Sequence, residues 1–147
     1  MFKHILIPTD GSDTASKAIK AGVALAKEMG AKVTGYCARE PVPLHLYREG
    51  SVVDRKLVDE FERRSEDFAR KSVGAVAVAA RAAGVKYKSV VTKTPVPYKG
   101  IVNAAKDQNC DAIFIASHGR RGIKRMLLGS VTQEVLAHSD VPVLVFR

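Results

Sequence analysis

Short apolar runs alternate along the chain with longer segments in which apolar residues recur every three to four positions. The runs are rich in Val, Ile and Leu, which is typical of strands buried in a parallel sheet. They predict five strands, at residues 3–8, 32–38, 85–93, 111–117 and 141–147. The fourth run, DAIFIAS, is the most apolar, so we expect it near the centre of the sheet.

The segments between the runs predict four helices. We expect the first to be capped by Ser12 and to end at Gly30, with Gly22 allowing it to approach the sheet closely. The second covers about residues 52–83, and the third begins at Pro97. The fourth opens at Ser130, where Ser-x-x-Gln fits a capping box. Residues 39–51 hold two prolines and no clean period, which predicts an irregular loop.

The predicted order alternates strictly between strand and helix, from the first strand to the fifth. This order specifies a doubly wound α/β fold, in which a five-stranded parallel sheet is covered by helices on both faces. No linker, repeat or low-complexity tract interrupts the chain, so residues 1–147 are expected to form one domain.

The net positive charge is concentrated in the second half of the chain. Residues 1–73 hold 13 Lys or Arg against 11 Asp or Glu, whereas residues 74–147 hold 11 against 4. Four of the later cations cluster beside glycines in the segment ASHGRRGIKRMLLGS: Arg120, Arg121, Lys124 and Arg125. Such a cluster is either a solvated surface loop or a site for a partner that carries phosphate.

Other features narrow the class of protein. The chain has no apolar run of about 18 residues and no N-terminal signal pattern, so we expect no membrane span and a cytoplasmic location. The two cysteines, Cys37 and Cys110, lie far apart without a CxxC motif, and we expect both to be packing thiols. The histidines show no metal-ligand spacing.

Two polar turns follow predicted strands, PTDGS after the first and ASHGRRGIKRMLLGS after the fourth. Ligands of open α/β sheets bind beyond the carboxyl ends of the strands, where the winding reverses, so both turns are expected at one crevice. Gly119 and Gly129 permit positive φ and close approach of backbone to a ligand. The helix start at Gly129 and Ser130 favours a negative group.

With these two turns, the whole chain resembles the universal stress protein family. The nucleotide-binding branch of that family carries Gly-x2-Gly-x9-Gly-(Ser/Thr), and the matching positions here are Ala116, Gly119, Gly129 and Ser130. The first glycine is therefore an alanine. Its methyl group obstructs a ligand only if the position needs positive φ or if the ligand touches the Cα atom.

The resemblance implies an adenine nucleotide, ATP or AMP, either alone or with Mg or Mn held through its phosphates. Asp10 would meet the ribose hydroxyls or that metal, although a turn residue that bonds its own backbone is an equal alternative. His118 is expected to order its loop and not to act as a base. The other residues that the resemblance places around the nucleotide are Pro8, Thr9, Cys37, Ala38, Ala116, Ser117, Gly119, Arg120, Gly129, Ser130, Val131 and Thr132.

The expected function is a stress-response protein that binds the nucleotide as a sensor or regulatory module. The chain has no Gly-x4-Gly-Lys-(Ser/Thr) motif and no evident catalytic carboxylate in the loop, so we expect no catalytic residue and little or no hydrolysis. A slow ATPase and a dimeric interaction protein with an empty site remain alternatives. The resemblance also implies a homodimer through the C-terminal strand, residues 141–147. Nucleic acid is not an expected partner, because no known RNA- or DNA-reading motif is present.

Overall fold

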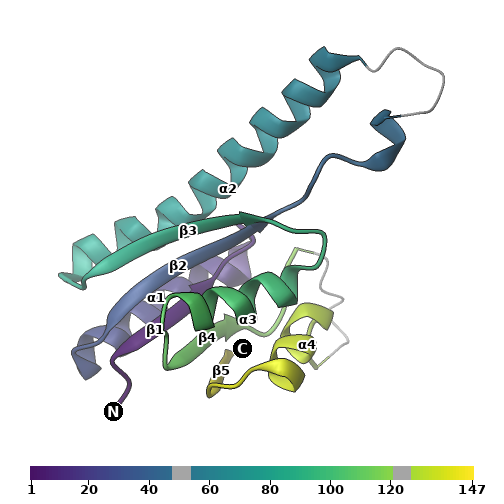
Figure 1. Cartoon of the computed structure of the whole chain (residues 1–147). Helices are drawn as coiled ribbons and strands as arrows, with labels where there is room; N and C mark the ends of the chain where they lie inside the picture. Colours follow the sequence, from purple (N-terminus) through teal and green to yellow (C-terminus); the bar gives the residue numbers. More distant parts are fainter. Residues whose placement is uncertain (48–53, 121–126) are drawn as a thin grey trace.

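The computed structural model describes residues 1–47, 54–120 and 127–147. Five parallel strands form one sheet in the order β3-β2-β1-β4-β5, as Figure 1 shows. The strands are β1 (His4–Pro8), β2 (Lys32–Arg39), β3 (Tyr87–Lys93), β4 (Ala112–Ala116) and β5 (Val143–Phe146). The predicted doubly wound α/β fold is confirmed. The chain winds outward in opposite directions from β1 and β4, so the winding reverses between these two strands.

Helices cover both faces of the sheet: α1 (Asp13–Met29) and α2 (Arg55–Ala83) one face, α3 (Pro97–Asp107) and α4 (Ser130–His138) the other. Ile5 and Ile7 of β1 face α1 and α2, whereas Leu6 packs with Ile101 of α3 and Val135 of α4. Alternate residues of one strand therefore serve two separate cores. The first turns of α2 extend past the carboxyl ends of β2 and β3 (Figure 1).

The predicted ends of the first helix are confirmed. The Ser12 hydroxyl accepts a hydrogen bond from the backbone N–H of Ala15 at 3.1 Å, and Gly30 ends the helix with a left-handed φ of 65°. Gly22 has the predicted role as well, because a Cβ atom there would lie 2.9 Å from side-chain carbons of Ile7 and Phe114. Helix α1 can therefore pack close to the sheet at this position.

Two local predictions are wrong. Helix α4 has Gly129 as its N-cap, and the Gln133 amide donates to the Leu128 carbonyl at 2.9 Å, so no capping box forms at Ser130. The third strand begins at Tyr87, because the N–H of Val85 still bonds the Ala80 carbonyl at the end of α2. Within the predicted loop of residues 39–51, residues Leu44–Tyr47 form a 3₁₀ turn (η1), and residues 48–51 lie outside the described chain. Across the described residues, none of the helices has the length and apolarity that a membrane span requires.

Candidate functional site

The turn after β1 is fixed by its own side chains. The Thr9 hydroxyl accepts from the N–H of Gly11 at 3.2 Å, and Asp10 Oδ1 accepts from the N–H of Ser12 at 3.0 Å. Gly11 has φ 77°, a left-handed conformation that glycine adopts without strain. The N–H of Thr9 bonds the Tyr36 carbonyl at 2.8 Å, which holds the turn against β2. The turn alternative for Asp10 is therefore realised in this structure.

Asp10 also reaches across the crevice to the loop after β4. Its Oδ2 atom accepts from the backbone N–H of Arg120 at 2.6 Å. A Cβ atom at Gly119 would lie 2.4 Å from the same oxygen, so the missing side chain of Gly119 makes room for the carboxylate. Neither Gly119 nor Gly129 has a left-handed φ. Of the two properties expected of these glycines, positive φ and close approach of the backbone, the structure shows the close approach.

The loop after β4 returns to the sheet through backbone hydrogen bonds. The N–H of Ser117 bonds the Phe146 carbonyl, and the N–H of Gly129 bonds the Ser117 carbonyl, each at 2.7 Å. The hydroxyl of Thr132 is buried and donates to the Ala116 carbonyl at 2.8 Å. These bonds hold the start of α4 beside the end of β4, with the exposed Ser130 and Val131 in its first turn.

His118 lies next to this junction, and its Nδ1 atom is 3.0 Å from the Ser117 hydroxyl. The expected loop-ordering role of the ring stays a prediction. Arg120 is the member of the basic cluster that the structure describes, whereas Arg121, Lys124 and Arg125 lie outside the described residues.

Helix α2 supplies a wall of the crevice that the sequence did not indicate. The Arg120 guanidinium lies over the ring of Phe68, 4.5 Å from its centroid, a cation–π distance. The Phe68 ring and the Ser72 hydroxyl also approach Gly11 so closely that a Cβ atom there would lie 2.9 and 3.0 Å from them. The apolar period of α2 predicts that Phe68 is a core residue, yet Phe68 is 39% exposed.

Cys37 and Ala38 lie on opposite faces of β2. Cys37 is buried with Ala69 and Val73 under α2, and its pKa is raised to about 11 by burial and by the negative charge of Asp10. Ala38 is partly buried against the core on the α3 side. The Cys37 thiol is therefore protonated at neutral pH and has the apolar, packing character that the sequence predicts.

Alanine fits the core at position 116. Ala116 is buried in the core between the sheet and α1, together with Ala112 and Phe114 of the same strand. Its φ is not positive, so alanine is unstrained here. In the described part of the chain, no group of three or more His, Cys, Asp or Glu side chains could hold a metal ion.

Comparison with known proteins shows the same pattern over the whole chain. Residues 1–147 match the family model of the universal stress protein family. Universal stress protein MJ0577 of Methanocaldococcus jannaschii is 32% identical over 164 aligned residues, covering 100% of this chain and 96% of that protein. The solved structure of MJ0577 superposes with a TM-score of 0.79 and 29% identity, covering 99% of this chain and 95% of that one.

Two solved complexes share the fold at lower identity. A universal stress protein in complex with cAMP superposes with a TM-score of 0.66 and 23% identity, covering 99% of this chain and 97% of that one. The universal stress protein from Archaeoglobus fulgidus in complex with dAMP gives a TM-score of 0.64 and 18% identity, covering 100% and 98%.

Proposed function

The chain belongs to the universal stress protein family, and from this premise we propose that it binds an adenine nucleotide in the crevice between the loops after β1 and β4. The protein would act in the stress response as a sensor or regulatory module whose state depends on ATP or AMP. The complexes of fold relatives with cAMP and dAMP support an adenine nucleotide as the class of ligand.

The hydrogen bond between Asp10 and Arg120 is the observation that carries the proposal. It joins the loops of the two strands between which the winding reverses, the position at which α/β sheets bind ligands. Each carboxylate oxygen of Asp10 accepts one backbone N–H, and each has a second lone pair. Asp10 can therefore order the two loops and still accept hydrogen bonds from ribose hydroxyls.

The phosphates would lie at the start of α4. The first backbone N–H groups of a helix lack partners within the helix and favour an anion, and here they belong to Ser130 and Val131. The N–H of Gly129 already bonds Ser117, and the Thr132 hydroxyl already bonds Ala116, so both residues would position the site. A metal ion, Mg or Mn, would arrive with the phosphates.

The adenine would lie over the end of β2, bordered by Pro8, Thr9 and Ala38. The side chain of Cys37 lies on the opposite face of this strand from that of Ala38. Hydrolysis would be slow or absent, because efficient catalysis needs a group that activates water. In this proposal Asp10 is a binding residue, because its oxygens order the two loops and would accept the ribose hydroxyls. We therefore propose a binding protein, with a slow ATPase as the second candidate.

Titration calorimetry with ATP, AMP and GTP, each with and without Mg, tests the binding. We expect ATP or AMP to bind with one site per chain and GTP to bind at least about tenfold more weakly. Asp10→Ala should abolish the binding, and Asp67→Ala, which removes an exposed carboxylate of α2, should leave it unchanged. An Asp10→Ala variant that binds ATP or AMP with the affinity of the wild type would overturn the proposal.

A phosphate-release assay at saturating MgATP separates the binding protein from an enzyme. Turnover well below about 1 per second agrees with a sensor, and turnover at or above that rate is ordinary for an enzyme. Mass spectrometry of gently purified protein adds a second readout, because a bound adenine nucleotide should be recovered with the chain.

A further inference from the structure

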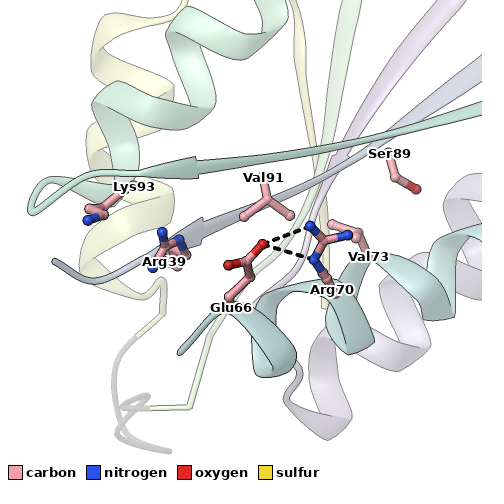
Figure 2. Close-up of a pocket in the computed structure, with 7 residues that line it drawn as sticks. All are labelled: Arg39, Glu66, Arg70, Val73, Ser89, Val91 and Lys93. Carbon is pink, nitrogen blue, oxygen red and sulfur yellow. Dashed lines mark hydrogen bonds and ion pairs between the residues drawn. The ribbon is translucent and has the colours of Figure 1, made fainter. Parts of the chain in front are cut away.

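A second hollow lies on the face of the sheet that α1 and α2 cover, between α2 and strands β2 and β3. Its volume is about 440 Å³, which is within the range of pockets for small molecules. Figure 2 shows Arg39 and Lys93 at one end of the hollow, Ser89 at the other, and Glu66 and Arg70 along the helix. Cys37 pairs with Val91, and two positions later Arg39 pairs with Lys93. Side chains two positions apart in a strand lie on the same face of the sheet, so these strand residues share one face.

Cations outnumber carboxylates around this hollow. Arg39 and Lys93 both bond Glu62, through Nη1 and Nζ respectively, each at 2.6 Å and each to a different carboxylate oxygen. These two hydrogen bonds, first that of Lys93, lower the pKa of Glu62. A guanidinium has five N–H donors and an ammonium three, so one carboxylate cannot satisfy both groups. The side chain of Arg39 is only 16% exposed, and it lines the hollow.

The remaining cation, Arg70, is held by a weak partner. Its Nη2 and Nε atoms donate to one oxygen of Glu66 at 2.7 and 3.1 Å, four residues away on α2 (Figure 2). The side chain of Arg70 is 72% exposed and that of Glu66 is 45% exposed, and a solvent-accessible pair of this kind contributes little stability. An incoming anion can therefore take the place of Glu66 at small cost, and the planar guanidinium can bind a carboxylate or phosphate through two parallel hydrogen bonds.

The floor of the hollow is apolar. Val73 of α2 packs with Cys37 and Ala69, and Val91 of β3 packs against this cluster. None of the described residues that line the hollow belongs to the loops after β1 and β4. Surface ion pairs form without an apolar floor and without a third cation. A ligand with an apolar body and an anionic end would contact both the apolar floor and the cations.

We propose that this hollow is a second ligand site, which takes a small amphipathic anion. Its carboxylate or phosphate group is held by Arg39, Arg70 and Lys93, and its apolar body lies on Val73 and Val91. The Ser89 hydroxyl, at the far end of the hollow, offers a polar contact to the other end of the ligand. The site is independent of the nucleotide crevice, so a negative result for one site does not contradict the other.

Titrations of ¹⁵N-labelled protein with phenyl phosphate, benzoate and neutral benzyl alcohol, followed by NMR, test the site. We expect phenyl phosphate or benzoate to shift the backbone amides of Ser89 and Val91 with saturation, and benzyl alcohol to leave them in place. The amides of Gly11 and Gly119 report the nucleotide crevice in the same spectra, so binding there is distinguished. Saturation by only one of the two anions identifies which anionic group the site prefers.

Variants on α2 provide the matched comparison. Arg70→Gln should weaken the binding of the anion at least about fivefold, and Glu66→Gln should strengthen it by removing the competing carboxylate. Arg64→Gln is the control, because Arg64 forms the same kind of exposed pair with Glu60 on the same helix and does not line the hollow. Equal losses in Arg70→Gln and Arg64→Gln, equal binding of benzyl alcohol, or shifts without saturation would each overturn the proposal. The spectrum of each variant also shows that it is folded.

Discussion

The carboxylate of Asp10 and the backbone N–H of Arg120 meet at 2.6 Å, although 110 positions separate the two residues in the chain. This bond joins the loops that follow β1 and β4. It exists because Gly119 has no side chain, since a Cβ atom there would lie 2.4 Å from the bonded oxygen. The geometry of the proposed nucleotide crevice therefore depends on one carboxylate and one glycine.

Gly119→Ala should displace the Asp10 carboxylate and break its bond to Arg120. We expect the affinity for adenine nucleotide to fall about tenfold, or about 1.4 kcal/mol, as measured by titration calorimetry. The control is Gly74→Ala in α2, where a Cβ atom would meet nothing within 4 Å. That variant should keep the affinity and raise the free energy of unfolding by about 0.5 to 1 kcal/mol, because alanine favours a helix over glycine. An unchanged affinity in Gly119→Ala would contradict this account of the crevice.

Gly129→Val should remove nucleotide binding while the chain stays folded. A Cβ atom at this position lies 3.3 Å from the Ser117 carbonyl oxygen and 3.4 Å from the His118 Cα, so both close contacts are with backbone. The two methyl groups of valine then push the start of α4 away from the end of β4, and the N–H groups of Ser130 and Val131 lose their position. Circular dichroism checks the fold and calorimetry the affinity. A folded variant that binds normally would rule out the start of α4 as the phosphate site.

Ala116→Gly, which restores the glycine of the family motif, should change nucleotide affinity by less than about tenfold. The alanine methyl group packs in the core with Ala112 and Phe114. The substitution should instead lower the free energy of unfolding by about 0.5 to 1 kcal/mol, since glycine weakens a strand interior. Urea denaturation measures this loss. A gain in affinity of a hundredfold would mean that alanine disables the site in the natural chain.

Sequence periodicity was sufficient for the strands, the helices and their order, because burial on one or two faces dictates which positions are apolar. The polar turns after the first and fourth strands also located both loops of the crevice, because ligands of open α/β sheets bind beyond the carboxyl ends of the strands. Phe68 and the second hollow could not be predicted in this way. Their positions depend on how far the long helix α2 extends past β2 and β3, and that offset leaves no local pattern in the sequence.

A buried histidine at the opposite end of β1 predicts how stability depends on pH. Burial, together with the positive charges of Lys32 and Lys88, lowers the pKa of His4, whereas Asp111 acts in the opposite direction. Its Nε2 atom is 2.7 Å from the Thr34 hydroxyl. The unfolded chain takes up a proton near pH 6.5 that the native ring binds only at lower pH. The free energy of unfolding should therefore fall as the pH is lowered below 6.5, by up to about 1.4 kcal/mol per pH unit.

Urea denaturation between pH 5 and 8 measures this dependence on pH. His4→Gln should flatten the slope below pH 6.5, even if the variant is less stable at every pH. The control is His138→Gln on α4, where the side chain is 51% exposed and the slope of the wild type should be retained. A slope that is the same in His4→Gln and in the wild type would assign the dependence on pH to other groups.

The C-terminal strand predicts how the chain assembles. Strand β5 pairs with β4 at the end of the sheet, and all four of its residues are only partly buried. Val143 and Val145 pack toward the core on the α3 and α4 side, whereas Leu144 and Phe146 pack toward the opposite core. An apolar edge strand with exposed backbone groups is a liability for a monomer, and a second copy related by a two-fold axis would cover it.

Val145→Lys or Val143→Lys should therefore shift a homodimer toward monomer or aggregate, because a charge on this strand would be buried against the partner without a counter-ion. Light scattering at tens of micromolar measures the mass of each variant. Val78→Lys is the matched control, since Val78 lies on α2, away from β5, and is 67% exposed. It should keep the mass of the wild type. A monomeric wild type at this concentration would refute the assembly through β5, and the exposed Val131 and Leu136 of α4 would then need another explanation.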